Sequence, residues 1–108
     1  MINNKVIIII TTSDNKDELI KLSDYVLDKK LAGCTQIVGP IISKYWWEGK
    51  IEKSDEYLLL IKTLTERFED IRKIITDMHS YSTPEIIGIE IDNISEQYYK
   101  WLISIVKG

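Results

Sequence analysis

The chain has 108 residues, of which 44% are hydrophobic and 29% are charged, and its formal net charge is −3. This length and composition predict a single globular domain over residues 1–108. The mildly acidic balance, with no window rich in Lys and Arg, argues against nucleic acid or an anionic membrane surface as a partner. The apolar runs are too short to span a bilayer. A single cysteine, Cys34, excludes an internal disulfide and fits a reducing compartment, so we expect a cytoplasmic protein.

The N-terminal part of the chain predicts a strand followed by a helix. Residues 5–10 form a nearly unbroken β-branched run, which is typical of a central strand covered on both faces. Either Ser13 or Asp14 is a suitable cap for the helix that follows. The apolar residues of that helix recur at helical spacing as far as Lys30.

The middle of the chain predicts two long strands, at residues 34–47 and 50–63. A tight turn at Glu48-Gly49 joins them, because a Gly at the second turn position supplies the positive φ that such a hairpin needs. Pro40 has no N–H to donate to a sheet, so the first long strand should carry a bulge or lie at an edge there.

The C-terminal part predicts a second helix, a strand and a last short helix. Thr65 is the expected cap of the second helix, which ends near His79. A strand follows over residues 85–91, and Ser95 caps the last helix. The order strand, helix, strand, strand, helix, strand predicts an α+β fold in which two crossovers interleave. The result is a ferredoxin-like four-stranded antiparallel sheet with helices on one side and an extra C-terminal helix.

Three consecutive aromatic residues, Tyr45, Trp46 and Trp47, precede the hairpin turn. Consecutive residues of a strand point to opposite faces, so rings should lie on both sides of the ribbon. A chain this short has little protein with which to cover both sides. We therefore expect these three residues to form an interface with further copies of the chain; burial of the whole ribbon within one domain is the alternative.

Several ordered motifs resemble the CutA family of divalent-ion tolerance proteins. They are KLAGC at residues 30–34, SKYWWEGK at 43–50, Glu56 with IKT at 61–63, HSYSTPEI at 79–86 and YKWL at 99–102. The resemblance implies a compact homotrimer of ferredoxin-like subunits whose long hairpins interlock. It also implies a link to divalent metals, copper above all, and kinship in fold with the PII signalling trimers. No enzymatic activity is established for such proteins.

The sequence departs from that family at positions connected with copper. Some members use a Cys just after the first strand and adjacent His residues, and the matching positions here are Thr11 and Met78 with His79. Only His79 keeps a strong ligand, because the Met78 thioether suits Cu(I) but is a poor ligand for a hard divalent ion. Ser80 replaces the family's Pro, which predicts a looser turn.

The candidate metal ligands are His79 and Glu85, with Tyr81 between them. An imidazole and a carboxylate suit Cu²⁺ or another divalent cation, and another subunit can complete the set. The alternative is a histidine at a helix end that is stabilised by the helix dipole.

A ligand cleft between subunits is a second candidate site, with Lys62, Glu56 and Tyr81 as its residues. Lys62 can hold an anionic ligand or pair with a carboxylate, and a lysine that extends to solvent from a strand end is an equal alternative. Cys34 is most simply a small buried apolar side chain, because nothing in the sequence brings His79 within its reach as a base.

These observations predict a non-enzymatic homotrimer that binds divalent cations and takes part in metal tolerance. The alternative is a PII-like sensor that holds a small anionic metabolite between subunits and signals to an unidentified protein partner. A hydrolase resembling the acylphosphatases is disfavoured, because the loop at residues 11–15 lacks the Arg that a phosphate cradle needs.

Overall fold

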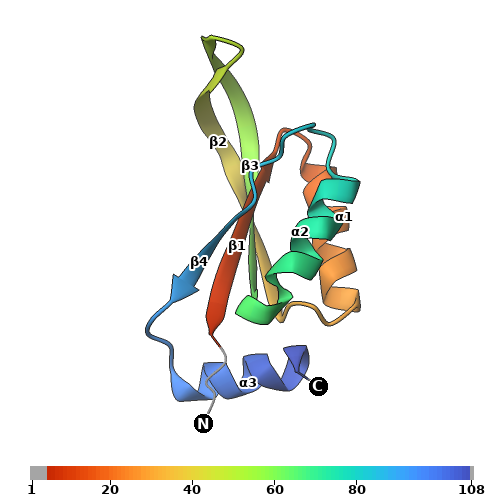
Figure 1. The fold of residues 1–108 in the computed structure, drawn as a ribbon, viewed down its shortest axis with the longest axis vertical. Helices are drawn as coiled ribbons and strands as arrows, with labels where there is room; N and C mark the ends of the chain where they lie inside the picture. The colour runs from red at the N-terminus through yellow and green to blue at the C-terminus, as the bar shows by residue number, and fades with distance from the viewer. Residues whose placement is uncertain (1–4, 108) are drawn as a thin grey trace.

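The computed structural model describes residues 5–107; residues 1–4 and 108, which the single-domain prediction includes, lie outside the described residues. The predicted α+β class is confirmed, with a four-stranded antiparallel sheet in the order β2-β3-β1-β4 (Figure 1). The elements in chain order are β1 (Val6–Ser13), α1 (Lys16–Asp28), β2 (Cys34–Trp47), β3 (Lys50–Leu64), the 3₁₀ turn η1 (Thr65–Arg67), α2 (Phe68–Met78), β4 (Ile87–Ile91) and α3 (Glu96–Val106).

Helices α1 and α2 lie together on one face of the sheet (Figure 1). Alternate residues of β1 and β3, such as Ile9 and Leu59, point into this layer and are fully buried. Leu22 of α1 and Ile75 of α2 close the same core from the helix side. A smaller cluster at one end of the sheet joins β1, β3 and α3 through Val6, Leu64, Leu102 and Val106.

The β2–β3 hairpin projects beyond the helices and makes the molecule elongated, with principal extents of 48 × 26 × 22 Å (Figure 1). Its turn has positive φ at both central residues, 50° at Glu48 and 79° at Gly49, so the predicted tight turn is confirmed. The register shifts between Val38 and Ile41, which confirms the irregularity predicted at Pro40. Strands β2 and β3 therefore stay paired from the body to the tip of the hairpin, with a single bulge between the two paired stretches.

Two predicted boundaries near the first helix are wrong. Strand β1 continues past Ile10 to Ser13, because β3 is long enough to pair with all of these residues. Consequently Ser13 is a strand residue, and Asn15 caps α1 by accepting the Glu18 N–H at 3.3 Å. The helix also ends earlier than predicted, at Asp28, and Lys30 adopts a positive φ of 58° as the chain leaves it.

Two later boundaries also differ from the prediction. Thr65 does not cap α2, because its hydroxyl donates to the Lys5 carbonyl and η1 intervenes before the helix begins at Phe68. Strand β4 begins at Ile87 and not at residue 85, since its pairing with β1 ends at the Ile10–Ile87 pair. The Ser95 cap of α3 is confirmed, with its hydroxyl accepting the Tyr98 N–H.

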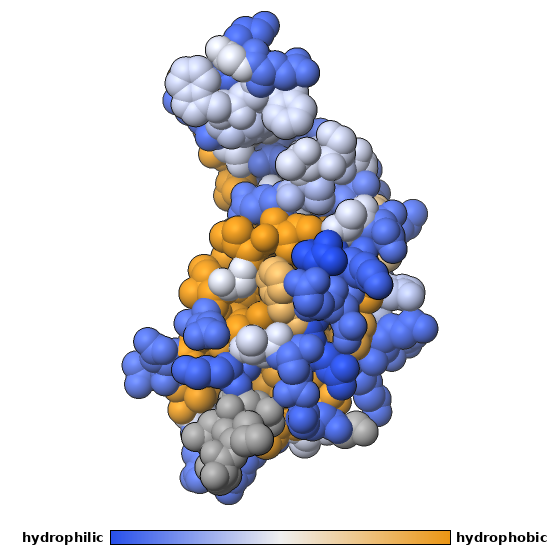
Figure 2. All heavy atoms as spheres, viewed as in Figure 1, coloured by the Kyte–Doolittle hydropathy of each residue, from blue (hydrophilic) through white to orange (hydrophobic). Residues whose placement is uncertain are grey.

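The second face of the sheet is covered by α3 only at one end. Ile87 and Ile89 of β4 pair with Ile10 and Ile8 of β1, and the two β4 side chains are about half exposed, at 47% and 49%. Figure 2 shows apolar atoms gathered in the middle of the molecule on the β4 side. The prediction that β1 is covered on both faces therefore holds fully for the helix face; on the second face Val6 and Thr12 are buried, but Ile8 and Ile10 remain partly exposed within a single chain.

Candidate functional site

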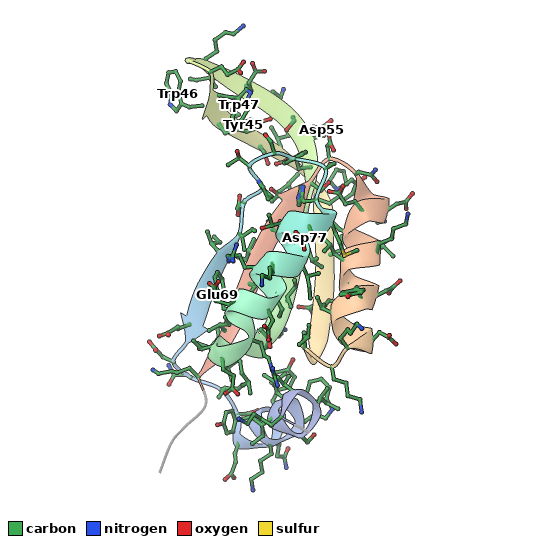
Figure 3. All side chains as sticks on the ribbon, turned by 45° about the vertical axis from the view of Figure 1, so that its right-hand side comes forward. Tyr45, Trp46, Trp47, Asp55, Glu69 and Asp77 are labelled. Carbon is green, nitrogen blue, oxygen red and sulfur yellow. The ribbon has the colours of Figure 1, made fainter. Side chains whose placement is uncertain are left out.

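A groove of about 830 Å³ lies between the hairpin and the turn that leads from α2 to β4. The hairpin supplies aromatic walls, since Tyr45, Trp46 and Trp47 lie on the part that projects beyond the body (Figure 3). Residues 81–85 supply the opposite wall, and β3 supplies Glu56. Three separate parts of the sequence thus meet at one concave surface.

Two of the three predicted cleft residues, Glu56 and Tyr81, are in direct contact. The Tyr81 hydroxyl donates to Glu56 Oε2 at 2.6 Å and accepts the Asp14 N–H at 3.0 Å. Glu56 is only 4% exposed. Burial raises the pKa of Tyr81 well above its ordinary value, and the hydrogen bond to Glu56 adds to the rise. The hydroxyl therefore stays protonated and holds the carboxylate in place.

Glu85, a predicted metal ligand, lines the same groove. Partial burial raises the pKa of its carboxyl, and the charge of Glu56 raises it further. The groove therefore contains two carboxyl groups that repel each other when both are ionised. Lys44 also lines it, and no ion pair joins Lys44 to either carboxylate in the described part of the chain.

The His79 ring is turned into the protein and its side chain is fully buried. Its Nε2 lies 2.7 Å from the Thr12 carbonyl, and its Nδ1 accepts the Tyr81 N–H at 3.0 Å. Since Nδ1 is an acceptor, the ring proton lies on Nε2, which donates to Thr12. Both ring nitrogens therefore have protein partners, and the ring ties the end of α2 to β1.

Sequence reasoning missed Glu18 as part of this network. Its Oε2 accepts the Ser13 hydroxyl at 2.9 Å and lies 3.3 Å from His79 Nδ1, and its Oε1 accepts the Ser80 N–H at 3.0 Å. In the sequence Glu18 is only an acidic residue in the first turn of a helix, which the helix dipole explains. Two of its partners, His79 and Ser80, are 61 and 62 residues away, so no local pattern indicates them. The Ser80 turn, predicted to be loose, is anchored by this carboxylate.

Lys62 is not part of the groove within one chain. It lies six residues beyond Glu56 on β3, which corresponds to about 20 Å along a strand. Its ammonium lies 5.8 Å from the centroid of the Tyr98 ring of α3. Cys34 pairs with Lys62 in the sheet, at the same end and far from His79. The structure thus separates Cys34 from the only imidazole, in agreement with the sequence argument.

The donors near His79 fit a preformed metal site poorly. No group of three His, Cys, Asp or Glu side chains that could hold a metal occurs within residues 5–107. Thr11, at the position matched to the family's Cys, is buried, and Met78 is partly exposed. A metal at His79 has to displace the Tyr81 N–H or the Thr12 carbonyl from the ring.

The family model for the CutA1 divalent ion tolerance protein matches residues 7–104. The chain is 38% identical over 96 residues to a divalent-cation tolerance protein CutA of Archaeoglobus fulgidus, covering 89% of this chain and 93% of the relative. It is 36% identical to a chloroplastic CutA protein of Arabidopsis thaliana, covering 89% of this chain and 53% of that protein. A solved structure described as the periplasmic divalent cation tolerance protein CutA of A. fulgidus superimposes with a TM-score of 0.90 at 37% identity, covering 94% and 98% of the two chains.

None of the helices in residues 5–107 has the length and apolar character needed to cross a membrane.

Proposed function

The chain belongs to the CutA1 family of divalent ion tolerance proteins, and we propose that it acts in tolerance of divalent metal ions as a non-enzymatic homotrimer. The element order and the strand order β2-β3-β1-β4 support the ferredoxin-like arrangement of the subunit.

The observation that carries the assembly part of the proposal is the apolar surface that one chain leaves uncovered. Trp46 is 72% exposed, and Tyr45 and Trp47 are exposed beside it on the hairpin. Ile87 and Ile89 extend this surface over the open face of the sheet. Monomeric proteins rarely leave contiguous apolar surface of this kind in water, so further copies of the chain are its natural cover.

Sedimentation velocity tests the assembly. We expect a trimer at micromolar concentration and a melting temperature that rises with protein concentration if unfolding is reversible. Trp47→Ala should shift the distribution toward smaller species, because its ring lies on the proposed interface. The matched control is Tyr25→Ala, which removes an exposed ring from α1 on the helix side. A monomeric wild-type protein contradicts the proposal.

For the metal itself we propose His79 and Glu85 as the ligands of Cu²⁺ or another divalent cation. Because both His79 nitrogens are hydrogen-bonded, binding requires a rearrangement of residues 79–85, and we expect it to be weak. Calorimetry of chelator-treated protein should show Cu²⁺ binding that is lost in His79→Ala. Since Cu²⁺ binds exposed imidazole and carboxylate sets in general, Zn²⁺ is the stricter test. Binding unchanged by His79→Ala rejects this site.

The sensor alternative with a small anionic ligand is not favoured. Two carboxyl groups, Glu56 and Glu85, face the groove, and Lys62 lies at the other end of β3 in the same chain. An anion in this groove meets like charge, which raises the free energy of the complex.

We further propose a cytoplasmic location, in line with the single Cys34. One relative is described as chloroplastic and one as periplasmic, so the compartment is to be tested by fractionation of cells that produce the protein. A cross-linked complex from the same cells would identify the downstream protein partner.

A further inference from the structure

The single histidine of the chain is held in an arrangement that leaves no ring nitrogen for a metal ion. The His79 side chain is fully buried, its Nδ1 accepts the Tyr81 N–H, and its Nε2 donates to the Thr12 carbonyl. A metal ion needs a ring nitrogen with a free lone pair, and the lone pair of Nδ1 is already engaged. All of these contacts lie within one chain, so packing of further copies can only add to the burial of the ring.

A carboxylate from another element holds the turn that contains this ring. The Glu18 side chain of α1 is 12% exposed, and its Oε1 accepts the Ser80 N–H at 3.0 Å. Its Oε2 accepts the Ser13 hydroxyl at 2.9 Å, which fixes the direction of the carboxylate. Ser80 lies directly between His79 and Tyr81 in the chain. The bond to its N–H therefore fixes the two residues that make the contact on Nδ1.

A carboxylate oxygen 3.3 Å from an imidazole nitrogen has two alternative roles. Glu18 Oε2 can share a metal ion with His79 Nδ1, or Glu18 can hold the ring in its closed arrangement. The hydrogen bonds favour the second role, because both oxygens of Glu18 already accept protein donors and Nδ1 already accepts an N–H. Hydrogen bonds to a charged acceptor are among the stronger ones, so they stabilise the arrangement in which they form.

We propose that Glu18 is a positioning residue that keeps His79 closed to metal ions. This inference rests on the proposed function, in which His79 is a metal ligand. A metal ion reaches Nδ1 only after the Tyr81 N–H moves away, and that movement carries the adjacent Ser80 N–H away from Glu18. The Glu18 bond therefore stabilises the state that does not bind metal. Apparent affinity falls with the fraction of molecules in the open state, so removal of Glu18 should strengthen binding at His79.

The first measurement contains no metal ion. Diethyl pyrocarbonate acylates an accessible, unprotonated imidazole nitrogen, and the chain has a single histidine whose peptide can be followed by mass spectrometry. In the assembled full-length protein, Glu18→Ala should speed the acylation of His79 by about tenfold or more, because it removes a hydrogen bond to a charged group from the closed state. An unchanged rate overturns the proposal.

The second measurement is calorimetry with Zn²⁺ on the same chelator-treated proteins. Glu18→Ala should bind Zn²⁺ about tenfold more tightly than the wild type, and the double variant Glu18→Ala/His79→Ala should lose this gain. Weaker binding by Glu18→Ala makes Glu18 a ligand and overturns the proposal, as does faster acylation without tighter Zn²⁺ binding.

The failure of this inference is distinguishable from the failure of the proposed metal site. Zn²⁺ binding to the wild type that is unaffected by His79→Ala rejects the metal site itself. Binding that requires His79 but is unaffected by Glu18→Ala rejects the positioning role alone.

Two further variants separate the hydrogen bond from the charge. Glu18→Gln keeps a side-chain oxygen that can accept the Ser80 N–H, so it should stay close to the wild type in both measurements. Asp17→Ala is the matched control, because Asp17 is exposed in the same helical turn and lines the same small surface pocket of about 210 Å³. It should change neither measurement. Far-UV circular dichroism confirms that each variant is folded. Effects of Glu18→Gln or Asp17→Ala as large as that of Glu18→Ala overturn the proposal.

Discussion

The two faces of the sheet differ in how completely one chain covers them. On the helix side, Ile9 and Leu59 are fully buried under α1 and α2. On the other side, Ile87 and Ile89 remain about half exposed, and only α3 covers one end. A single chain therefore encodes a complete core for its own folding and a second apolar face, which is the proposed interface with further copies of the chain. Strand parity distributes apolar residues to both, since neighbours in a strand point to opposite faces.

Neighbouring leucines of β3 provide the sharpest test of this difference. Leu59→Ala removes a fully buried side chain from the helix-side core and should lower the free energy of unfolding by about 2–5 kcal/mol. Leu60→Ala makes the same chemical change on the open face. Its cost should appear as a loss of assembly that depends on protein concentration. Urea denaturation at two protein concentrations measures the free energy of unfolding and its dependence on concentration for each variant. If the two variants behave identically, the proposed difference between the two faces of the sheet is wrong.

A charge on the open face should break assembly and leave the fold intact. Ile89→Lys places an ammonium where the proposed interface is apolar, and we expect at least about tenfold weaker association because burying an unpaired charge is unfavourable. Glu90→Lys is the adjacent control, because its side chain points to the opposite face. Sedimentation velocity and far-UV circular dichroism should show smaller, folded particles for Ile89→Lys alone. Equal effects of the two variants reject the open face as the interface.

Loss of the Tyr81 hydroxyl should lower the stability of the fold more than loss of the hydroxyl of Tyr45, the exposed tyrosine on the other wall of the groove. Tyr81→Phe leaves the buried Glu56 carboxylate and the Asp14 N–H without their partner, which should cost about 1–3 kcal/mol of stability. Tyr45→Phe removes only a long hydroxyl contact to Ser54, at 3.5 Å and exposed, and should change stability by less than about 0.5 kcal/mol. Thermal unfolding of the two variants, measured side by side, checks the difference; equal losses contradict it.

The smallest expected effect concerns pH. Burial and the charge of Glu56 raise the pKa of Glu85 in the folded state, so the folded protein binds this proton more tightly than the unfolded chain does. Stability from this group is present at low pH and is lost as pH rises through the raised pKa. Glu85→Gln should therefore be slightly more stable than the wild type near neutral pH and equal to it in acid. If Glu85→Gln is less stable than the wild type at neutral pH, the stability difference has the opposite sign and the raised pKa of Glu85 does not explain it.

The sequence predicts the residues that line the groove as parts of three different sites. Glu56 and Tyr81 are predicted cleft residues, Glu85 is a predicted metal ligand, and residues 45–47 are predicted interface residues; in the structure all of them line one groove. Lys62 is expected in the same cleft because it can hold an anionic ligand or pair with a carboxylate, but the sequence does not fix how far apart two residues of one strand lie from a shared site. Distance along β3 therefore separates it from the groove.

Short-range chemistry by itself determined the order of helices and strands, the turn at Glu48-Gly49 and the bulge after Val38. These features depend on residues within a few positions of one another, whose spacing and backbone preferences are visible in the sequence. Only the tertiary structure decided that His79 turns inward to Thr12 and that Glu18 anchors the turn at Ser80. Those contacts join residues more than 60 positions apart, and they exist only because the sheet brings the ends of β1 and α2 together.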